Sequence, residues 1–351
     1  MIKEKNIIKK NGEPGSNPIK GKKEGIPCPD FFNLFKECRL CPRECGINRM
    51  EESAKAGSGF CRQDYRLRVA HVGAHFGEEP PISGTRGSGT IFFSGCSLRC
   101  SFCQNHQISI EGAGEAFLIE DLFERVVELI RVYDVHNINF VTPDHFFPYT
   151  FRLVDLLRKA GYSLPILYNT SGYQSVAMLK PAEDYADIYL PDFKYSDSLL
   201  AKTLSRCGDY PAKAIEAISE MVKQKGFLDS FEKGEETASK GVLVRHLILP
   251  GKVKNSLDAL AALFLEFGPG LPLSLMSQYH PVIHHKDPDM NRRITREEFD
   301  GVYQQALDLG FKNMFIQFPE RDADQSQAGP PFLPDFQEEE PFPGNDPGMR
   351  P

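Results

Sequence analysis

Residues 96–103 read Cys-Ser-Leu-Arg-Cys-Ser-Phe-Cys and closely follow the apolar run Thr-Ile-Phe-Phe at residues 90–93. Three cysteines separated by three and then by two residues can place three thiolates on three corners of a cubane iron–sulfur cluster. This stretch offers no fourth thiolate, whereas a closed electron-carrier cluster normally uses four cysteines. One iron is therefore left open to bind a small chelating ligand, which favours a reactive cluster.

The run at 90–93 predicts a strand that leads almost directly into the cysteine loop. Open α/β folds and barrels keep their chemistry at the C-terminal ends of their strands. The alternative interpretation of Cys96, Cys100 and Cys103 is zinc ligation or burial as small hydrophobic residues. The spacing and the preceding strand together favour the cluster.

The composition is that of an ordinary globular protein. The chain has 351 residues, enough for one large α/β domain with appendages or for two domains. Its net charge of -7 gives no reason to expect a nucleic-acid surface. The sequence shows neither an apolar run near the ~20 residues that cross a bilayer nor the apolar region of a signal peptide. We therefore expect a cytoplasmic protein without a membrane or nucleic-acid partner, in which clustered cysteines are ligands and not disulfides.

A second group of cysteines precedes the predicted barrel, in a segment that we place at residues 26–64. Four thiolates suit tetrahedral zinc and suit a second [4Fe-4S] cluster equally well. The segment is therefore predicted to bind metal, with iron–sulfur and zinc both open. Two further cysteines, Cys28 and Cys207, receive no role. The four predicted ligands are Cys38, Cys41, Cys45 and Cys61.

Both ends of the chain are predicted to be tails. Residues 1–25 hold many Lys, Gly, Asn and Pro and few apolar residues, so burial cannot offset the entropy of ordering them. Residues 321–351 combine repeated proline with the acidic run 338–340 and show no periodicity. We expect this second tail to be disordered or loosely packed.

Residues 65–95 are predicted to form strands on either side of a glycine-rich loop between Gly73 and Gly89. Glycine there permits close approach of the backbone to a ligand or partner, and a surface loop that closes one end of a barrel is the alternative. The paired carboxylates Glu78 and Glu79 could touch a substrate, but adjacent acids in a loop are usually solvated.

After the cysteine loop, helical and extended patterns alternate. Seven strands separated mostly by helices require a parallel sheet with right-handed crossovers, so residues 65–320 are predicted to form a full or partial βα barrel. The last helix carries a capping box, Thr295 with Glu298, and ends at Gly310. After the strand at 90–93, strands are expected near 137–142, 165–170, 186–192, 241–249, 271–279 and 313–318, and helices near 120–134, 149–160, 175–180, 256–267 and 296–309, with more helix between 197 and 225.

Polar residues collect where these strands end. Because a barrel keeps its active site at this side, five polar strand ends predict a ligand-binding site. They are Thr-Pro-Asp-His at 142–145, Asn-Thr-Ser-Gly at 169–172, Asp-Phe-Lys at 192–194, Arg245 with Pro-Gly at 250–251, and Gln-Tyr-His at 278–280. We assign no catalytic role to His145, His246, His284 or His285, because a lone histidine near a strand end is more often a hydrogen-bonded structural residue.

The cysteine loop resembles that of the radical S-adenosylmethionine enzymes, whose CxxxCxxC loop carries an aromatic residue just before its third cysteine, as Phe102 does here. Most of residues 88–320 is similar to the glycyl-radical-enzyme activases, typified by the pyruvate formate-lyase-activating enzyme. The chain departs from them in an Asp-His pair at 144–145, in place of a Gly-Gly-Glu signature, and in its four-cysteine segment. It therefore resembles a poorly characterised activase-like branch. The matching stretches are 95–105, 169–173, 192–194, 245–251 and 279–280.

This resemblance implies an α/β fold, a partial (βα) barrel of about six repeats. It implies an iron–sulfur oxidoreductase that reductively cleaves S-adenosylmethionine to a 5′-deoxyadenosyl radical for hydrogen abstraction, with activation of a glycyl-radical enzyme as one use. An electron donor such as flavodoxin or ferredoxin and a protein or peptide substrate are the implied partners. The alternatives are radical modification of another peptide or small molecule, or a non-catalytic electron carrier or redox sensor.

The resemblance also implies roles for individual residues. Cys96, Cys100 and Cys103 would hold a [4Fe-4S] cluster with S-adenosylmethionine, and no further catalytic residue is assigned. Asp192 with Asn169 and Thr170 would hold a monovalent cation near the carboxylate of the cofactor. The remaining residues expected at the cofactor are Phe102, Asn105, Lys194, Arg245 and His280.

Overall fold

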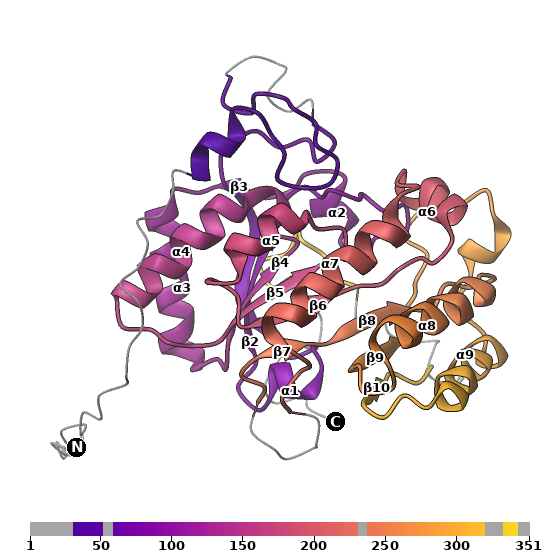
Figure 1. The fold of residues 1–351 in the computed structure, drawn as a ribbon. Helices are drawn as coiled ribbons and strands as arrows, with labels where there is room; N and C mark the ends of the chain where they lie inside the picture. The colour runs from indigo at the N-terminus through magenta and orange to yellow at the C-terminus, as the bar shows by residue number, and fades with distance from the viewer. Residues whose placement is uncertain (1–30, 52–58, 231–236, 320–332, 343–351) are drawn as a thin grey trace, which may run out of the picture.

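The computed structural model describes residues 31–51, 59–230, 237–319 and 333–342 (Figure 1). The predicted tail at 1–25 and Cys28 lie outside these residues. The helices within them include none that combines the length and the apolar composition of a membrane span.

A wall of parallel strands forms the centre of the fold. In one sheet β2 (Ser88–Phe93), β4 (Ile138–Val141), β5 (Ile166–Thr170), β6 (Ile188–Pro191) and β7 (Gly241–Val242) pair in this order, each parallel to the next. A second sheet orders β8 (Val244–Leu247), β9 (Leu273–Met276) and β10 (Met314–Ile316), also in parallel. A parallel bridge between Asp192 and Arg245 joins the end of β6 to β8.

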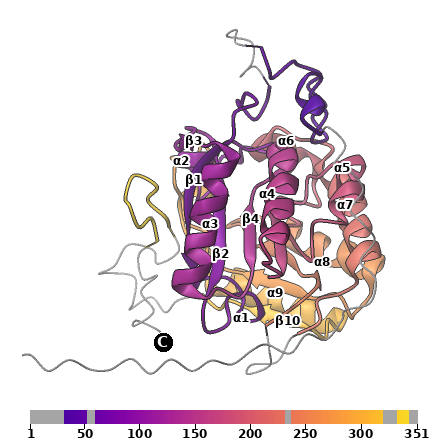
Figure 2. The ribbon, with the colours of Figure 1, turned by 90° about the vertical axis from the view of Figure 1, so that its left-hand side faces the viewer.

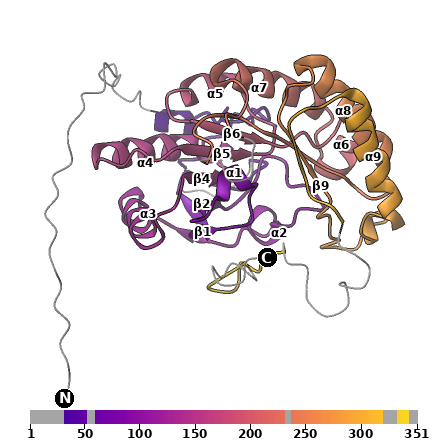
Figure 3. The same cartoon turned by 90° about the horizontal axis from the view of Figure 1, so that it is seen from below.

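Helices cover the outside of this wall (Figure 3). The amphipathic α3 (Ile119–Tyr133) buries Leu122, Val126, Leu129 and Ile130, the stripe that its sequence predicts. The other helices of the outer layer are α4 (Phe147–Lys159), α5 (Val176–Ala182), α7 (Tyr210–Lys225), α8 (Val253–Phe267) and α9 (Arg296–Leu309).

These elements form six successive βα repeats, β2–α3, β4–α4, β5–α5, β6–α7, β8–α8 and β9–α9, followed by β10. Among the described residues the sheet order ends at β3 on one side and at β10 on the other. The partial βα barrel predicted from the sequence is therefore confirmed. Three repeats contain a short element between the strand and the helix: η2 (Asp144–Phe146), α6 (Ser198–Ser205) and η3 (Pro288–Asn291).

The strand before the barrel is antiparallel to its neighbours, an orientation for which the sequence made no prediction. β1 (Arg68–His75) runs antiparallel to both β2 and the short β3 (Glu115–Ala116). The connection from β1 to β2, residues 76–87, contains only a four-residue helix and returns the chain antiparallel. Gly73 and Gly89, predicted to bound a loop, lie inside these two strands, and the connection contains the helix α1 (Pro80–Ser83).

The predicted strand at 241–249 is divided into β7 and β8. Gly241 begins β7 with a φ of +117°, and a Cβ at this position would lie 2.4 Å from the carbonyl oxygen of Phe227. Only glycine fits this close approach of two backbones, and Phe227 forms a bridge with Val242 beside it.

The loop that carries α1 closes the lower end of the barrel, as one of its two interpretations predicts (Figure 2). Ile82 of α1 is fully buried and packs with side chains of β5 and β6 that point away from the outer helices. Leu167, Ile188, Leu190 and Leu243 belong to this apolar floor. The barrel interior above the floor, which we call the lumen, contains the polar residues described below.

The four-cysteine segment lies across the opposite end of the barrel (Figure 1). Its helical turn η1 (Phe31–Phe35) packs on α4, with Phe31 against Phe151 at a ring-centroid distance of 4.9 Å. The cysteine loop and α2 (His106–Ser109) lie at this end, since they follow the C-terminal end of β2. Both cysteine groups are therefore at the same end of the barrel.

Residues 333–342 differ from the expectation of a disordered or loosely packed tail. Phe336 and Phe342 pack with Phe92 of β2 and Val141 of β4. The composition alone gives no partner for this segment, but the partial barrel leaves an apolar face that it covers. The segment lies beside β1 and α2 (Figure 3).

The N-terminus of α9 is capped by Thr295 and Glu298. The predicted capping box between Thr295 and Glu298 is present, and Glu298 also accepts from Arg292 and from the backbone N–H of Gly251 at 2.7 Å. These hydrogen bonds, above all those from Arg292, hold the pKa of Glu298 at about 2, below its ordinary value of 4.5.

We expect Glu298→Gln to lower the free energy of unfolding by about 1 kcal/mol at pH 7. Because the pKa is depressed in the folded state, the loss is complete above the ordinary carboxyl pKa and shrinks as pH falls toward 2. Urea unfolding at several pH values measures it. Glu297→Gln, in the same helical turn but exposed, is the control, and a loss independent of pH would contradict the account.

Candidate active site

The cysteine loop begins where the buried strand β2 ends. Gly95 adopts a φ of +85°, and a Cβ there would lie 2.8 Å from the carbonyl oxygen of Cys61. The backbone N–H of Leu98 donates to Cys96 Sγ at 3.3 Å, and Ser205 Oγ of α6 donates to Cys100 Sγ at 3.0 Å. Polar hydrogens are therefore already directed at two of the three sulfur atoms.

The three thiols of the loop lie close enough to influence one another. Burial raises the pKa of Cys96 and of Cys103, and the Cys100 thiolate raises both further. Within the described residues, no group of three His, Cys, Asp or Glu side chains is already arranged around a metal position. A cluster would therefore require the thiols to rotate and to release their protons.

The aromatic residue of the motif fills the space beneath the loop. Phe102 is buried, with ring-centroid distances of 6.3 Å to Tyr195 and 6.1 Å to Tyr279. Asn105 precedes α2, and its carbonyl oxygen accepts the N–H of Ser109 at 2.9 Å. Phe102 thus shields the loop from water, whereas Asn105 positions the helix that follows.

Below the loop, the lumen contains a pair of opposite charges. Lys194 Nζ donates to Asp192 Oδ2, and both side chains are largely buried. Burial alone would lower the pKa of Lys194, but Asp192 and the nearby Cys100 and Cys103 outweigh it, so the pKa is raised. Lys194 therefore remains a cation next to the cysteine loop.

A second ionic group lies deeper in the lumen. Arg245 Nη2 donates to Glu78 Oε2, and Arg245 Nε lies 3.1 Å from Glu79 Oε1. The side chains of Glu78 and Glu79 are only 8% and 9% exposed, so the expectation of solvated acids is wrong. The loop between β1 and β2 carries them into the barrel, where Arg245 compensates their charge.

Asparagines of the sheet complete this group. Glu78 Oε1 accepts from Asn139 Nδ2 at 2.9 Å and from Asn169 Nδ2 at 3.2 Å. Of the residues expected to hold a cation, Asn169 therefore binds Glu78 and Asp192 binds Lys194. Thr170 Oγ1 is buried without a hydrogen-bond partner. The cation site stays a prediction.

His280 lies at the end of the last polar stretch, after β9. Its Nδ1 atom is buried without a hydrogen-bond partner, and burial lowers its pKa from 6.5. It is therefore a neutral imidazole near pH 7, with one ring nitrogen available to a ligand.

Asp144 is a site residue for which the sequence analysis predicts no function. It is fully buried, and it accepts from Ser97 Oγ at 2.8 Å and from Gln174 Nε2 at 2.9 Å. Burial raises its pKa. Its position at a strand end was the only signal in the sequence. Asp144 fixes the cysteine loop to the end of β4.

Two histidines near strand ends have structural hydrogen bonds, as predicted. His145 Nε2 lies 2.7 Å from the carbonyl oxygen of Ser94, and burial lowers its pKa to about 3. His246 lies between the Phe193 carbonyl and Ser256 Oγ, and burial lowers its pKa to about 4. Both rings are neutral.

The four-cysteine segment is fixed to the cysteine loop by Arg43. Its guanidinium donates to the carbonyl oxygens of Ser97 at 2.9 Å, Ser205 at 2.9 Å and Arg206 at 2.6 Å. It therefore connects the segment to the loop and to the end of α6. The guanidinium also lies 3.8 Å from the centre of the Phe60 ring.

The four predicted ligands of this segment converge. Burial raises the pKa of Cys61, and Cys38 and Cys45 contribute. Burial likewise raises the pKa of Cys41, with contributions from Cys61 and Cys38. Cys45 is exposed and the other three are buried. The binding of an ion or cluster by these four thiols stays a prediction.

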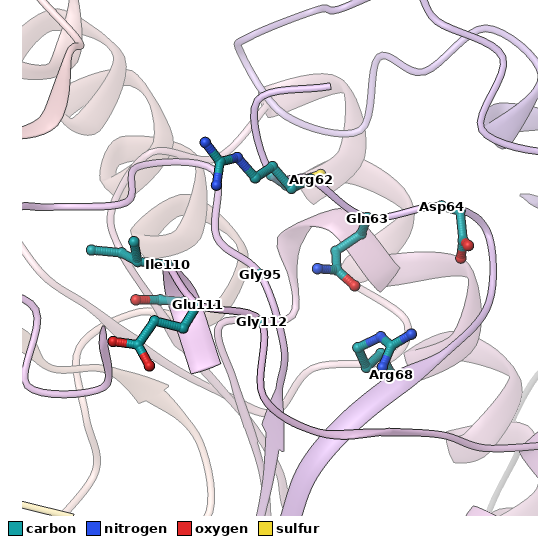
Figure 4. A pocket seen from close by; sticks show the side chains of 10 residues that line it. Arg62, Gln63, Asp64, Arg68, Gly95, Ile110, Glu111 and Gly112 are labelled. Atoms are coloured by element: carbon teal, nitrogen blue, oxygen red, sulfur yellow. The ribbon is translucent and has the colours of Figure 1, made fainter. Parts of the chain in front are cut away.

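A pocket of about 410 Å³ lies where the segment meets the cysteine loop (Figure 4). It is polar and lies outside the lumen. Arg62, Asp64 and Arg68 line one side, and Gly95 and Glu111 line the other.

Comparison with known proteins agrees with this site. Residues 90–264 match the sequence profile of the radical SAM superfamily. An uncharacterised protein of Methanocaldococcus jannaschii is 29% identical over 298 residues, which cover 80% of this chain and 76% of that protein.

Solved structures show weaker likeness. Native anSMEcpe with bound AdoMet has a TM-score of 0.46 and 13% identity over 64% of this chain and 61% of that one, so less than two thirds of its length is spanned. A domain of pyruvate-formate lyase-activating enzyme from Bacteroides vulgatus has a TM-score of 0.33 and 15% identity, covering 49% of this chain and 92% of that one. Methylornithine synthase has a TM-score of 0.41 and 16% identity, covering 72% and 80%. TM-scores below 0.5 define no closer relationship.

The chain carries a radical SAM superfamily domain on a partial βα barrel. The family uses a [4Fe-4S] cluster and S-adenosylmethionine. The residues present fit both: three thiols converge in one loop, and the unpartnered Thr170 Oγ1 and His280 Nδ1 can serve a polar cofactor.

An alanine variant tests whether Arg245 stabilises the fold itself or only contacts a bound cofactor. We expect Arg245→Ala to lower the free energy of unfolding of the cluster-free chain by about 3–5 kcal/mol, because it leaves two buried carboxylates without compensation. Urea unfolding measures it, and adding Glu78→Gln with Glu79→Gln should restore part of the loss.

Arg296→Ala is the matched control, because Arg296 pairs with Asp300 on the exposed surface of α9. Its cost should stay below about 1 kcal/mol. Equal small costs for the two arginines would show that Arg245 does not hold the cluster-free lumen together.

Proposed function

We propose that this chain is a radical SAM oxidoreductase of the activating-enzyme type, whose substrate is a protein glycine or another peptide. The observation that carries the proposal is the three-thiol loop directly above a lumen with buried charges. When bound, the cluster and S-adenosylmethionine supply one-electron chemistry that yields methionine and a 5′-deoxyadenosyl radical, which takes a hydrogen atom from the substrate.

The protein supplies ligands, orientation and exclusion of water. Cys96, Cys100 and Cys103 are the cluster ligands in this proposal, and Lys194 is a buried cation near Cys100 and Cys103. The buried ring of Phe102 excludes water from the loop, which protects a reactive species from side reactions.

Activation of a glycyl-radical enzyme is supported by the sequence stretches that match the activases, from 95–105 to 279–280. Modification of another peptide or of a small molecule is the alternative within the same chemistry. An electron carrier or redox sensor is the alternative outside it, but a carrier needs neither an open iron nor a lumen lined with charged residues.

The four-cysteine segment is proposed to hold a second [4Fe-4S] cluster or a zinc ion. Arg43 connects it to the carbonyl of Ser97, a residue of the cysteine loop, so a second cluster would be held by a segment fixed to that loop. The proposed electron donor is a protein such as flavodoxin or ferredoxin. The eight cysteines of the described residues are free thiols, which suits a reducing compartment such as the cytoplasm.

Cysteine variants test the radical chemistry. After anaerobic reconstitution with iron and sulfide, reduction with dithionite and addition of S-adenosylmethionine, the wild type should form 5′-deoxyadenosine, detected by chromatography. Cys96→Ala, Cys100→Ala and Cys103→Ala should each abolish it, because each removes an iron ligand.

Cys207→Ala is the control, because Cys207 is buried but its sulfur contacts Asp209 and not the loop. This variant should keep the activity. Product formation by Cys96→Ala at the wild-type rate would overturn the assignment.

Metal analysis tests the second site. Two clusters correspond to about eight irons per chain, and one cluster with structural zinc corresponds to about four irons and one zinc. Cys41→Ala and Cys61→Ala should lose the metal of the four-cysteine segment, either about four irons or one zinc, and should keep the irons of the cysteine loop. Unchanged iron and zinc contents in both variants would contradict a metal site in the four-cysteine segment.

A further inference from the structure

The lumen has an apolar side distinct from its charged centre. His71 pairs with Phe92 across β1 and β2, and Phe92 pairs with Val141 across β2 and β4. Cross-strand partners share one face of a sheet. Thr90 and Asn139 form another pair on this face, and Asn139 binds Glu78 in the lumen. The apolar side is therefore part of the barrel interior.

The chain covers this side with its own segment 333–342. The ring of Phe342 lies 4.5 Å from that of His75 and 5.1 Å from that of Phe92, between ring centroids. The ring of Phe336 lies 5.4 Å from that of Phe92 and 5.9 Å from that of Phe342. Together with His71, whose ring lies 5.9 Å from that of Phe342, three phenylalanines and two histidines form one aromatic cluster from two distant parts of the chain.

A glutamine aligns the segment at its beginning. Gln107 Nε2 donates to Asp335 Oδ1 at 2.8 Å, and Gln107 Oε1 accepts the backbone N–H of Phe336 at 2.7 Å. One side-chain amide therefore hydrogen-bonds to both a carboxylate and the backbone of the next residue. Gln107 lies in α2, four residues after Cys103, so this contact is next to the cysteine loop.

The apolar residues of the segment face the protein, and its acidic residues face solvent. Pro334 and Pro341 are buried and the two phenylalanines are partly buried, whereas the acidic run 338–340 is exposed. A turn closes the segment, since the N–H of Asp335 donates to the carbonyl of Pro341 at 2.8 Å. It is a compact peptide that places aromatic side chains into the lumen and leaves acids in solvent.

We propose that the surface formed by His71, His75, Phe92 and Gln107 is a peptide-binding site. Its ligand is a short acidic segment with two phenylalanines, each one or two residues after a proline, and residues 333–342 are its intramolecular occupant. This inference deepens the proposed function and rests on it in one respect: a partner segment of this chemistry that displaces residues 333–342 enters the lumen beside the cysteine loop, where hydrogen abstraction takes place.

The first experiment tests docking in the full chain. The sequence contains no tryptophan, so Phe336→Trp provides a single fluorescent reporter. We expect the docked indole to be at least about threefold less sensitive to iodide quenching than the same residue in the free peptide, because the lumen shields it.

Gln107→Ala in the reporter chain should raise the quenching toward that of the free peptide, because it removes both hydrogen bonds. Gln304→Ala is the matched control, since its amide donates to Asp308 on exposed α9. A reporter as accessible as the free peptide before any further substitution would overturn the proposal.

The second experiment tests binding from outside. A fluorescein-labelled peptide with the sequence of residues 333–342 is titrated by anisotropy against the wild type and against Phe336→Ala/Phe342→Ala, whose own segment lacks the anchors. The variant should bind at least about tenfold more tightly than the wild type, because a tethered competitor acts at an effective concentration on the order of mM.

A peptide with both phenylalanines replaced by alanine is the ligand control, and circular dichroism checks the fold of the variant. Equal binding of the two peptides, or no binding to the variant at about 1 mM, would overturn the site. These titrations use neither reductant nor S-adenosylmethionine. Peptide binding without 5′-deoxyadenosine formation would therefore support the peptide site and contradict the proposed function. Formation of 5′-deoxyadenosine without peptide binding would support the proposed function and contradict the peptide site.

Discussion

The buried guanidinium of Arg245 is the contact on which the interior of the barrel depends. Its backbone bridges to Asp192 and so joins the two sheets, and its side chain compensates Glu78 and Glu79 from the loop that closes the barrel floor. Burial alone would lower its pKa, but the surrounding carboxylates outweigh this effect, so the charge is permanent. One cation thereby fixes the wall and the floor relative to each other.

A barrel wall that stops short of closure has to cover an exposed side. Here β1 extends the sheet in antiparallel orientation, and residues 333–342 cover the face of β1 and β2 that looks into the lumen. The apolar floor around Ile82 separates this interior from solvent at the lower end. The floor and residues 333–342 therefore cover two sides of the interior, and the four-cysteine segment lies across the remaining end.

Local sequence patterns were sufficient to predict much of this structure. The cysteine spacing, the stripe of α3 and the capping box of α9 depend on residues within a few positions of each other. The partnership of Glu78 with Arg245 spans 167 residues, and adjacent acids in a loop carry no sign of a distant cation. For the same reason the antiparallel β1 and the docking of Phe336 and Phe342 could not be predicted: their partners exist only once the barrel has formed.

The contact made by Arg43 has a consequence for sequence variation. Its three acceptors are backbone carbonyls, at positions 97, 205 and 206. Every residue type offers the same carbonyl, so this contact tolerates mutational drift in the cysteine loop and at the end of α6. Arg43 serves them through Nε, Nη1 and Nη2, three donors spread over one planar guanidinium, whereas the donors of a lysine all lie on one atom. This contact therefore constrains position 43 alone, whereas Ser97 and Ser205 are constrained by the separate hydrogen bonds of their own side chains.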